Sequence, residues 1–320
     1  WNPVIMNRID GIYNEDLWRV HELNRSRLIR TCRELMVKQY EKRNAPKSMM
    51  GDIESVLDQG ALTIVFARRF ATYKRSHLLF MEPDRLEAIL TSKTHPVQII
   101  FAGKAHPKDQ EGKDLIKRVV QFAKKPNIRH RLIFLEDYDI NIARVLVQGA
   151  DVWLNTPRRP FEACGTSGMK AAINGALNIS ILDGWWCEGF SEERGWRIGN
   201  GEEHLDHEYQ DTVESQALYT VLTDEVIPCF YDRKNGDSPQ RWLYMMKESM
   251  KMAMKSFCSH VMVSNYNNVF YIPSAKRLQA LLSDNAAEAK ALALQRERLR
   301  ELWKFIKLES PVSKKPGPFR

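Results

Sequence analysis

The run Ala61-Leu62-Thr63-Ile64-Val65-Phe66 is almost wholly apolar and contains several β-branched side chains. A short run of this kind is typical of a strand that is buried on both faces of a sheet. Similar runs predict further strands at 97–101, 131–135, 151–154 and 177–182. The stretches between them predict helices at about 75–90, 109–124, 140–148 and 167–174. This alternation predicts an α/β fold with a doubly wound parallel sheet, whose ligands lie at the C-terminal ends of the strands.

The regions on either side of this alternation are predicted to be helical. Apolar residues recur at helical spacing from about 14 to 43, and Asn44-Ala45-Pro46 then ends the helix. After about Leu205 the strand pattern fades, and helices are predicted at 204–225, 239–257 and 275–307, with a turn at Asn235-Gly236. We therefore expect a leading helical segment at 1–50, an α/β domain at 51–203, a helical region at 204–310 and a flexible tail at 311–320.

The composition, with 43% hydrophobic and 28% charged residues, is that of a soluble globular protein. No run of about 18 apolar residues predicts a membrane helix, and the N-terminus lacks a secretory signal pattern. The five cysteines are scattered and form no C-x-x-C pair, which argues against a zinc site or a disulfide framework. We expect no metal site, no membrane partner and a reducing, cytoplasmic location.

The formal net charge of +8 raises the question of nucleic-acid binding. The sequence shows no basic stripe with interleaved aromatic residues and no nucleic-acid-binding motif. A site for a small anionic molecule explains a local excess of arginine and lysine equally well. We therefore expect no nucleic-acid partner.

Four cations lie directly after the first predicted strand, in Arg68-Arg69-Phe70-Ala71-Thr72-Tyr73-Lys74-Arg75. At a strand's C-terminal end they would place positive charge where α/β sheets bind ligands. Guanidinium groups bind phosphate oxygens in a bidentate way, and lysine adds a point charge. The segment predicts a phosphate site, with a solvated basic loop as the alternative. Gly103, after the second predicted strand, would let the backbone approach a ligand, although a tight turn explains it as well.

A longer segment runs from a strand end into a helix, Arg158-Arg159-Pro160-Phe161-Glu162-Ala163-Cys164-Gly165-Thr166-Ser167-Gly168-Met169-Lys170. Its small residues free backbone N–H groups at a helix N-terminus, which is a ready anion site. Glu162 stands before this loop, where a carboxylate can accept hydrogen bonds from sugar hydroxyls. Lys170 is expected to be partly desolvated by apolar neighbours, which would lower its pKa and favour a neutral amine able to form an imine. A glycine-rich helix start with a surface lysine is the alternative.

Several segments together resemble the α-glucan (glycogen, starch, maltodextrin) phosphorylases, and more narrowly their short bacterial and archaeal branch. They are 66–75, 101–107, Leu135-Glu136-Asp137-Tyr138, 159–175 and Leu182-Asp183-Gly184-Trp185-Trp186, and they occur in family order. The resemblance implies that this chain is the C-terminal half, a Rossmann-like second domain of a glycosyltransferase-B fold with C-terminal helices. It implies a reaction in which an α-1,4-glucan and inorganic phosphate give glucose 1-phosphate.

The resemblance also assigns roles to residues. Lys170 would attach pyridoxal phosphate, whose phosphate would relay a proton to the substrate phosphate. The residues implied to bind this cofactor are Lys170, Arg68, Tyr138, Thr166, Ser167 and Gly168. The residues implied to be catalytic are Lys170 together with Arg69 and Lys74, which would clamp the substrate phosphate. The residues implied to bind the transferred glucose are Glu162, Ala163, Cys164 and Gly165.

This sequence departs from the family pattern in two respects. Cys164 stands where the glucose-binding loop usually has serine. The family's N-terminal domain, which supplies acceptor contacts and a glycine loop against the phosphate, does not precede Trp1. We therefore expect that domain as a missing partner, this chain alone as an incomplete enzyme, and a homodimer as a further candidate assembly.

Two other readings of the site remain open from the sequence. A nucleotide-sugar glucosyltransferase of the glycogen or starch synthase type has the same fold. Many of these enzymes carry a second glutamate where this chain has Lys170, and a cation there suits an aldehyde cofactor better. The other reading is a non-catalytic glucan-binding domain, in which Trp185-Trp186 would stack on sugars. The retained Arg69, Lys74 and Lys170 argue against it.

Overall fold

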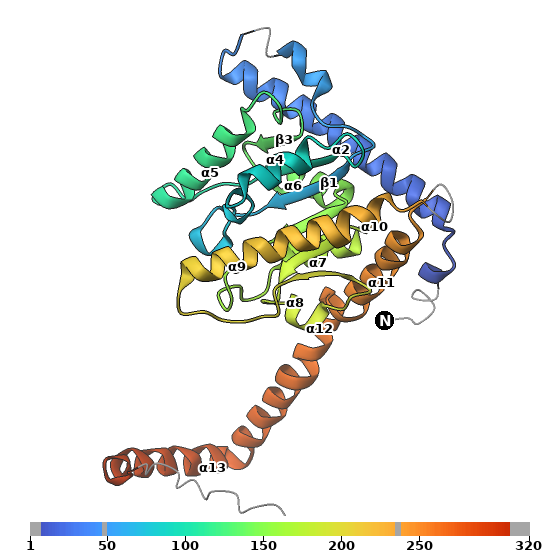
Figure 1. Cartoon of the computed structure of the whole chain (residues 1–320). Coiled ribbons are helices and arrows are strands. Elements are labelled where there is room, and N and C mark those ends of the chain that lie inside the picture. The colour runs from blue at the N-terminus through green and yellow to red at the C-terminus, as the bar shows by residue number, and fades with distance from the viewer. Residues whose placement is uncertain (1–7, 47–49, 234–237, 308–320) are drawn as a thin grey trace, which may run out of the picture. The chain divides into compact units, whose positions relative to one another are not determined.

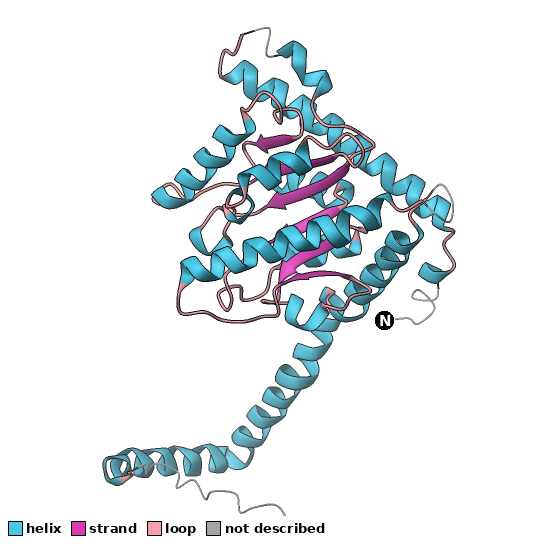
Figure 2. Ribbon diagram, viewed as in Figure 1, coloured by secondary structure: helices cyan, strands magenta, loops and turns pink. Residues whose placement is uncertain are grey.

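The computed structural model describes residues 8–46, 50–233 and 238–307. The chain divides into two compact units, Trp1–Cys258 and Ser259–Arg320, and the first contains the sheet. Figure 2 shows this sheet enclosed between helices. The predicted α/β fold is confirmed.

Within the described residues, six parallel strands form one sheet in the order β3-β2-β1-β4-β5-β6. The strands are β1 (Leu62–Ala67), β2 (Val97–Ala102), β3 (Leu132–Leu135), β4 (Val152–Asn155), β5 (Leu177–Ile181) and β6 (Gly195–Ile198). The strand order reverses between β1 and β4, which are hydrogen-bonded neighbours. The crevice at the C-terminal ends of these two strands is where open α/β sheets bind ligands.

The five predicted strands are confirmed, but the sequence pattern does not predict β6. This edge strand has only four residues, Gly195-Trp196-Arg197-Ile198, and the side chain of Arg197 is exposed. A strand that alternates in this way lacks the continuous apolar run by which the other five strands are recognised.

Alternate residues of each strand pack against helices on opposite faces of the sheet. In β1, Leu62, Ile64 and Phe66 face one core, while Val65 and Ala67 face the other. The helices on the first face are α4 (Pro83–Leu90), α5 (Gln110–Ala123), α9 (His207–Thr220) and α10 (Ile227–Tyr231). The helices on the second face are α2 (Asn14–Lys42), α6 (Ile140–Gly149) and α7 (Thr166–Ile173). Figure 1 shows α9 lying across its face of the sheet.

A smaller core forms where α8 (Trp186–Gly189) and α11 (Gln240–Ser256) meet. Trp185 and Trp186 lie in it, 4% and 0% exposed, with ring centroids 5.0 Å apart. Both rings are therefore packed inside the first unit and are not available as a surface platform for sugars.

The predicted helix at 75–90 is wrong in its first half. Only α4 is helical there, preceded by single turns at Thr72–Lys74 and Leu78–Phe80. Arg75 adopts a left-handed conformation (φ 49°, ψ 50°), which a right-handed helix cannot accommodate. Pro83, which lacks a backbone N–H, occupies the first turn of α4, where that donor is not needed.

The expected boundary at 203/204 does not coincide with the division of the chain. Helices α9, α10 and α11 pack on the sheet within the first unit, and α2 packs against α6 in the same unit. The helix predicted at 204–225 continues from α9 through a π-helical turn (Val221–Val226) into α10. The predicted turn at Asn235-Gly236 and the predicted tail at 311–320 lie outside the described residues.

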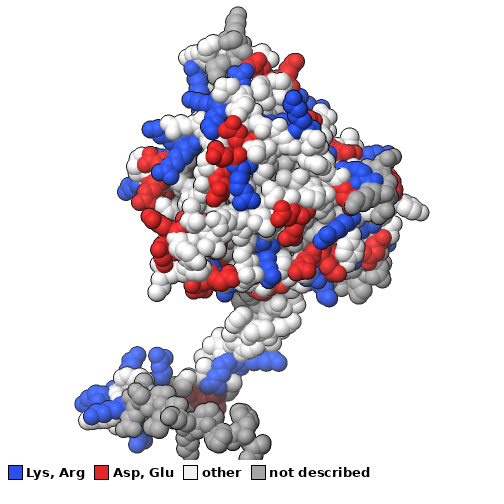
Figure 3. Space-filling view, viewed as in Figure 1, with Lys and Arg blue, Asp and Glu red and all other residues white. Residues whose placement is uncertain are grey.

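The second unit is helical, as predicted for 275–307. It contains α12 (Ser259–Tyr266), a π-helical turn (Asn267–Tyr271) and α13 (Ile272–Leu302), with a last turn at Trp303–Phe305. Non-helical backbone from Ser283 to Ala286 interrupts α13. Among the described residues, none of the helices combines the length and apolar character that crossing a membrane would require. On the face seen in Figure 3, lysine and arginine side chains of the first unit are interspersed with aspartate and glutamate.

A buried ion cluster ties α2 to the sheet. Asp151, which precedes β4, is fully buried, and its Oδ1 lies 2.7 Å from both His21 Nε2 and Arg25 Nη1. Its Oδ2 accepts a hydrogen bond of 2.8 Å from the Thr63 backbone N–H. Burial alone would raise the pKa of Asp151, but these partners outweigh it and hold the pKa below its ordinary value.

Replacing Asp151 with Asn is expected to lower the free energy of unfolding by about 3–5 kcal/mol, because the buried Arg25 loses its buried counter-charge and, within the described residues, keeps only the exposed Glu22 at 3.7 Å as an ion-pair partner. Since the folded pKa of Asp151 is lowered, its contribution is present above the ordinary aspartate pKa and is lost as the pH falls through the folded value. Urea denaturation checks the prediction. Asp52→Asn, which breaks the exposed pair with Arg129, is the control, with an expected change below about 1 kcal/mol. Equal decreases of the unfolding free energy in Asp151→Asn and Asp52→Asn would contradict the prediction.

Candidate functional site

Two loops meet at the crevice between β1 and β4, and both carry residues that the sequence singles out. We call residues 68–75, which follow β1, the β1 loop, and residues 156–165, which lead from β4 into α7, the β4 loop. The Arg158 backbone N–H donates to the Tyr73 carbonyl at 2.7 Å, so the two loops are joined directly. Their contact brings together side chains that are about 90 residues apart in the sequence.

The centre of the site is a cluster of two cations and one carboxylate. Arg68 Nη2 lies 3.3 Å from Glu162 Oε2, and Lys74 Nζ pairs with the same oxygen. Arg68 and Lys74 are each only 8% exposed. One carboxylate, whose side chain is 11% exposed, therefore faces two buried cations, and the excess positive charge favours an anionic ligand.

Arg68 has unused hydrogen-bonding capacity inside the site. Its Nε and Nη1 are buried and have no hydrogen-bond partner among the described residues. Burial lowers the pKa of Arg68, and the opposing influences are Glu162, Tyr73 and Tyr138. The pKa of the Tyr138 hydroxyl is raised by burial and is lowered in turn by Arg68. Arg68 and Tyr138, both predicted to bind a cofactor, are thus electrostatic neighbours.

The start of α7 follows the β4 loop. Gly165, in a left-handed conformation (φ 86°), is its N-cap, and the helix begins at Thr166, whose side chain is exposed. Ser167 Oγ accepts a hydrogen bond of 3.4 Å from Trp153 Nε1, and the Gly168 carbonyl accepts one of 3.1 Å from Asn178 Nδ2. The first backbone N–H groups of a helix have no partner within it, so this end of α7 can bind an anion.

The predicted glucose-binding residues are held in place by the segment after β5. Asp183 Oδ2 accepts a hydrogen bond of 2.9 Å from the Glu162 backbone N–H, and the Trp185 backbone N–H donates to the Cys164 carbonyl at 2.8 Å. Burial raises the pKa of the Asp183 carboxyl. Asp183 has no role assigned from the sequence, although the Asp183-Gly184 turn is part of the motif that carries the resemblance.

Lys170 is exposed, which overturns the expectation that it would be partly desolvated. Helix α7 buries Gly168 and Ala171 against the sheet and Ala172 in the core of Trp185 and Trp186, so Lys170 points away from that buried side. Residues adjacent in a helical sequence do not share a face, and the apolar neighbours of Lys170 therefore do not cover it. Arg69 is also exposed, and its side chain forms no hydrogen bond or ion pair with the described residues. Ala163 is exposed as well.

Gly103 packs closely against the β1 loop. A Cβ at this position would lie 2.0 Å from the Arg68 carbonyl oxygen and 2.8 Å from the Phe70 ring. Gly103→Ala is therefore expected to displace Arg68 and to cost about 1–3 kcal/mol of unfolding free energy. Thermal denaturation checks this, with Gly51→Ala as the control because a Cβ there meets nothing within 4 Å. A Gly103→Ala protein as stable as the control would contradict the expectation.

A groove of about 760 Å³ opens beside the two loops, with Thr72, Tyr73, Arg158 and Phe161 among its lining residues. The side chain of Phe161 is 58% exposed, directly before Glu162 in the chain. Within residues 8–46, 50–233 and 238–307, no group of three or more His, Cys, Asp or Glu residues is arranged to hold a metal ion.

The chain is similar to phosphorylases of known name. Glycogen phosphorylase of Mycobacterium tuberculosis (strain H37Rv) is 40% identical over 306 residues, which cover 96% of this chain and 36% of that protein. Glycogen phosphorylase of Aquifex aeolicus is 45% identical over 263 residues, covering 82% of this chain and 38% of that protein. Maltodextrin phosphorylase of Thermococcus litoralis is 38% identical over 305 residues, which cover 95% of this chain and 36% of that protein.

This chain therefore spans between 36% and 38% of the length of these curated relatives. The sequence pattern of the family described as carbohydrate phosphorylase matches residues 2–224, which include the whole sheet and both loops of the site. The resemblance expected from the motifs is confirmed: the chain belongs to the carbohydrate phosphorylase family.

Proposed function

We propose that this chain is the cofactor- and phosphate-binding part of an α-glucan phosphorylase. The reaction is the cleavage of an α-1,4-glucan by inorganic phosphate, which gives glucose 1-phosphate and a chain one glucose shorter. The observation that carries the proposal is the cluster of the buried Arg68 and Lys74 with Glu162, with two unpartnered guanidinium N–H groups, at the crevice of a carbohydrate phosphorylase fold.

The residues of the site fit pyridoxal phosphate as the cofactor. The unpartnered N–H groups of Arg68 suit a phosphate dianion, and burial strengthens each such hydrogen bond. The cofactor residues further along the chain are Tyr138, then Thr166, Ser167 and Gly168 at the start of α7, and Lys170, whose exposed amine would be the attachment point. When bound, this group supplies a second phosphate that exchanges a proton with the substrate phosphate.

Arg69 and Lys74 are proposed to bind the substrate phosphate. Departure of the glucosyl group builds positive charge on the sugar, which a nearby phosphate stabilises, and fixed cations keep two phosphates close despite their repulsion. Removing one such cation is expected to lower the rate by about 10²–10³-fold. Lys74 is already held in the site by Glu162, whereas the exposed Arg69 is free to turn toward a ligand.

The β4 loop is proposed to bind the transferred glucose through Glu162, Ala163, Cys164 and Gly165. Burial, together with Glu162 and Glu188, raises the pKa of the Cys164 thiol. The thiol is therefore neutral at physiological pH and adds no negative charge beside the phosphates. Cys164 can replace serine here where the loop backbone makes the contacts.

The remaining partners are also proposals. The part of the relatives that this chain does not span is proposed to supply the acceptor contacts and to cover the exposed Lys170 and Arg69. Glycogen or maltodextrin, which appear in the names of the relatives, are the proposed glucans. A homodimer and a cytoplasmic location complete the proposal.

Ligand binding to the purified chain separates this function from its nearest rival. Equilibrium dialysis against pyridoxal phosphate and, separately, against UDP-glucose and ADP-glucose is expected to show stoichiometric binding of pyridoxal phosphate alone. Glucose 1-phosphate release from maltoheptaose and inorganic phosphate then tests the reaction in the protein that carries this chain. Binding of a nucleotide sugar without pyridoxal phosphate would contradict the proposal and favour a glycogen or starch synthase type of transferase.

A further inference from the structure

The β1 and β4 loops are tied together behind the cluster as well as within it. Thr156 Oγ1 lies 3.0 Å from the Lys74 carbonyl oxygen and 3.1 Å from that of Arg75. Together with the backbone hydrogen bond from Arg158 to Tyr73, these contacts fix the end of the β1 loop to the beginning of the β4 loop. We call this contact between residues 73–75 and 156–158 the junction. The position of Lys74 relative to the β4 loop depends on this junction.

Arg75 makes the central side-chain contacts of the junction. Its guanidinium is fully buried and donates to the carbonyls of Thr156 and Pro157, at 3.0 and 2.8 Å. Its left-handed backbone (φ 49°) is uncommon for a residue with a side chain and persists only where the surroundings hold it. The side chain of Lys74 reaches Glu162 in the site, while that of Arg75 reaches α9 on the other side.

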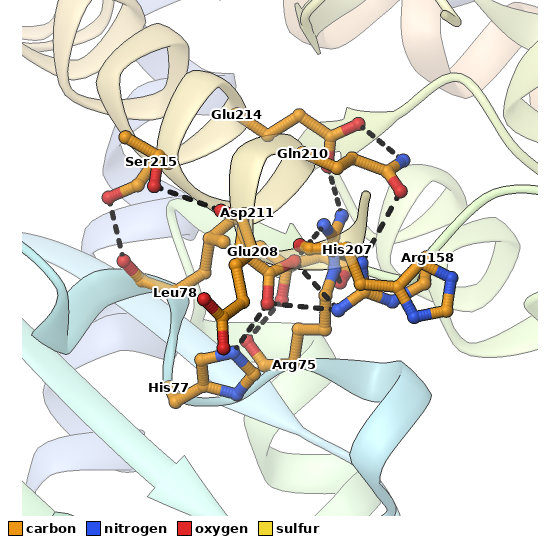
Figure 4. Close-up of polar contacts among 12 residues, drawn as sticks. Arg75, His77, Leu78, Arg158, His207, Glu208, Gln210, Asp211, Glu214 and Ser215 are labelled. Carbon is orange, nitrogen blue, oxygen red and sulfur yellow. Dashed lines mark hydrogen bonds and ion pairs between the residues drawn. The ribbon is translucent and has the colours of Figure 1, made fainter. Parts of the chain in front are cut away.

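A single carboxylate on α9 closes the junction (Figure 4). Asp211 Oδ1 accepts a hydrogen bond of 2.8 Å from Arg75 Nη1, and Oδ2 accepts one of 2.9 Å from Arg158 Nη2. Asp211 Oδ2 also lies 3.0 Å from His77 Nε2, just beyond the β1 loop. Asp211 thus holds side chains from both loops at once.

The negative charge of Asp211 is important for its contacts with Arg75 and Arg158. Burial would raise the pKa of Asp211, but hydrogen bonds from His77 and Arg75 and the charges of Arg75 and Arg158 hold it well below its ordinary value. Glu214 also pairs with Arg75, but the described contacts of its side chain do not extend to Arg158 or His77. Without the Asp211 carboxylate, Arg75 would keep Glu214 as an ion-pair partner. Within the described residues, the Arg158 side chain would keep only its hydrogen bonds to Gln210 and to the His207 carbonyl.

We propose that Asp211 is a positioning residue that sets the spacing between the β1 loop and the β4 loop, and so the arrangement of Arg68 and Lys74 around Glu162. Asp211 does not contact these three side chains and acts on them through Arg75 and Arg158. The inference rests on the proposed function in one respect, because it takes a phosphate group as the ligand of the cluster of Arg68, Lys74 and Glu162. The coupling of the loops is a property of the chain itself.

Hydrogen exchange of the 320-residue chain, followed by mass spectrometry, tests the coupling. In Asp211→Asn, peptides that cover the two loops are expected to exchange at least ten-fold faster, while β1, β2 and β4 keep their protection. The Arg158 amide, bonded to the Tyr73 carbonyl, is the direct reporter. Glu208→Gln removes an exposed carboxylate from the same helix and is expected to exchange like the unmodified chain. Asp211→Glu, which keeps the charge, is expected to recover most of the loop protection.

The affinity for pyridoxal phosphate, measured on the same variants, is a second readout. The dissociation constant is expected to rise at least ten-fold in Asp211→Asn and to stay unchanged in Glu208→Gln. Unchanged loop exchange in Asp211→Asn would overturn the inference, and so would an equal loss of protection in the strands, which indicates a general role in folding. A chain that fails to bind pyridoxal phosphate in its unmodified form would count against the proposed function, and the exchange data would still decide the role of Asp211.

Arg158→Gln keeps the experiment decisive if Asp211→Asn does not fold. This half-buried side chain is the contact of the β4 loop with Asp211, and it also bonds to Gln210 and to the His207 carbonyl, so the substitution releases the β4 loop from α9. Faster exchange confined to the β4 loop is the expected result, because Arg75 still holds the β1 loop to Asp211. Unchanged exchange in the β4 loop of Arg158→Gln would overturn the inference.

Discussion

Replacing Arg68 with Met is expected to weaken the binding of pyridoxal phosphate by about 10²–10³-fold. Arg68 offers two buried N–H groups that have no partner within the described chain. A hydrogen bond to a charged group contributes about 1.5–3 kcal/mol, and each 1.4 kcal/mol is a factor of about ten in affinity. Met has a similar length and is apolar, so the substitution removes the donors without adding a buried polar group. A titration followed by the absorbance of the cofactor measures the effect.

The neighbouring Arg69 provides a matched control for this prediction. Arg69→Met removes the same charge one residue away, but its guanidinium is exposed and has no hydrogen bond or ion pair with the described residues. The affinity for pyridoxal phosphate is expected to be unchanged in this variant, and the KM for inorganic phosphate is expected to rise. Equal losses of cofactor affinity in the two variants would show only a general effect of positive charge and would contradict a specific site at Arg68.

Replacing Glu162 with Gln is expected to have opposite effects on phosphate binding and on turnover. The carboxylate of Glu162 pairs with both Arg68 and Lys74, so it competes with phosphate for the same two cations. Its removal is expected to tighten the binding of inorganic phosphate by about ten-fold, which corresponds to about 1.4 kcal/mol. The rate of phosphorolysis is expected to fall by about 10²–10³-fold, because the proposed contact of Glu162 to the transferred glucose is lost.

Calorimetric titration with phosphate and steady-state kinetics measure these two effects separately. Glu188→Gln is the control, since Glu188 is an exposed carboxylate that also raises the pKa of Cys164 but forms no ion pair with the cluster. The phosphate affinity and the rate of phosphorolysis are both expected to be unchanged in Glu188→Gln. Weaker phosphate binding in Glu162→Gln would contradict the prediction, because it would mean that Glu162 organises the cations and does not compete for them.

The sequence predicts the inner part of the sheet well because those strands are buried on both faces. Their apolar runs, such as 62–67 and 97–102, match strands that helices cover on both faces. The edge strand β6 is not predicted, because the exposed Arg197 interrupts its apolar run. The two site loops are predicted for the same reason as the strands, since ligands bind where parallel strands end.

The parts of the site that depend on distant contacts are not predictable from local pattern. Asp211 reaches Arg75 across 136 positions of the chain, and nothing in the sequence of His207–Thr220 distinguishes it from the other charged residues of that helix. The exposure of Lys170 depends on which face of α7 meets the sheet. The same sequence, Met169-Lys170-Ala171, is compatible with either orientation until the neighbouring strands are placed.

The central claim is that Lys170 holds pyridoxal phosphate, and one measurement tests it most directly. The purified chain is incubated with pyridoxal phosphate, reduced with borohydride, digested and analysed by mass spectrometry, with Lys170→Arg treated in parallel. The account predicts one pyridoxyl group, attached to Nζ of Lys170, and no labelling of the variant under the same conditions. Labelling spread over other lysines, or equal labelling of the Lys170→Arg chain, would contradict it.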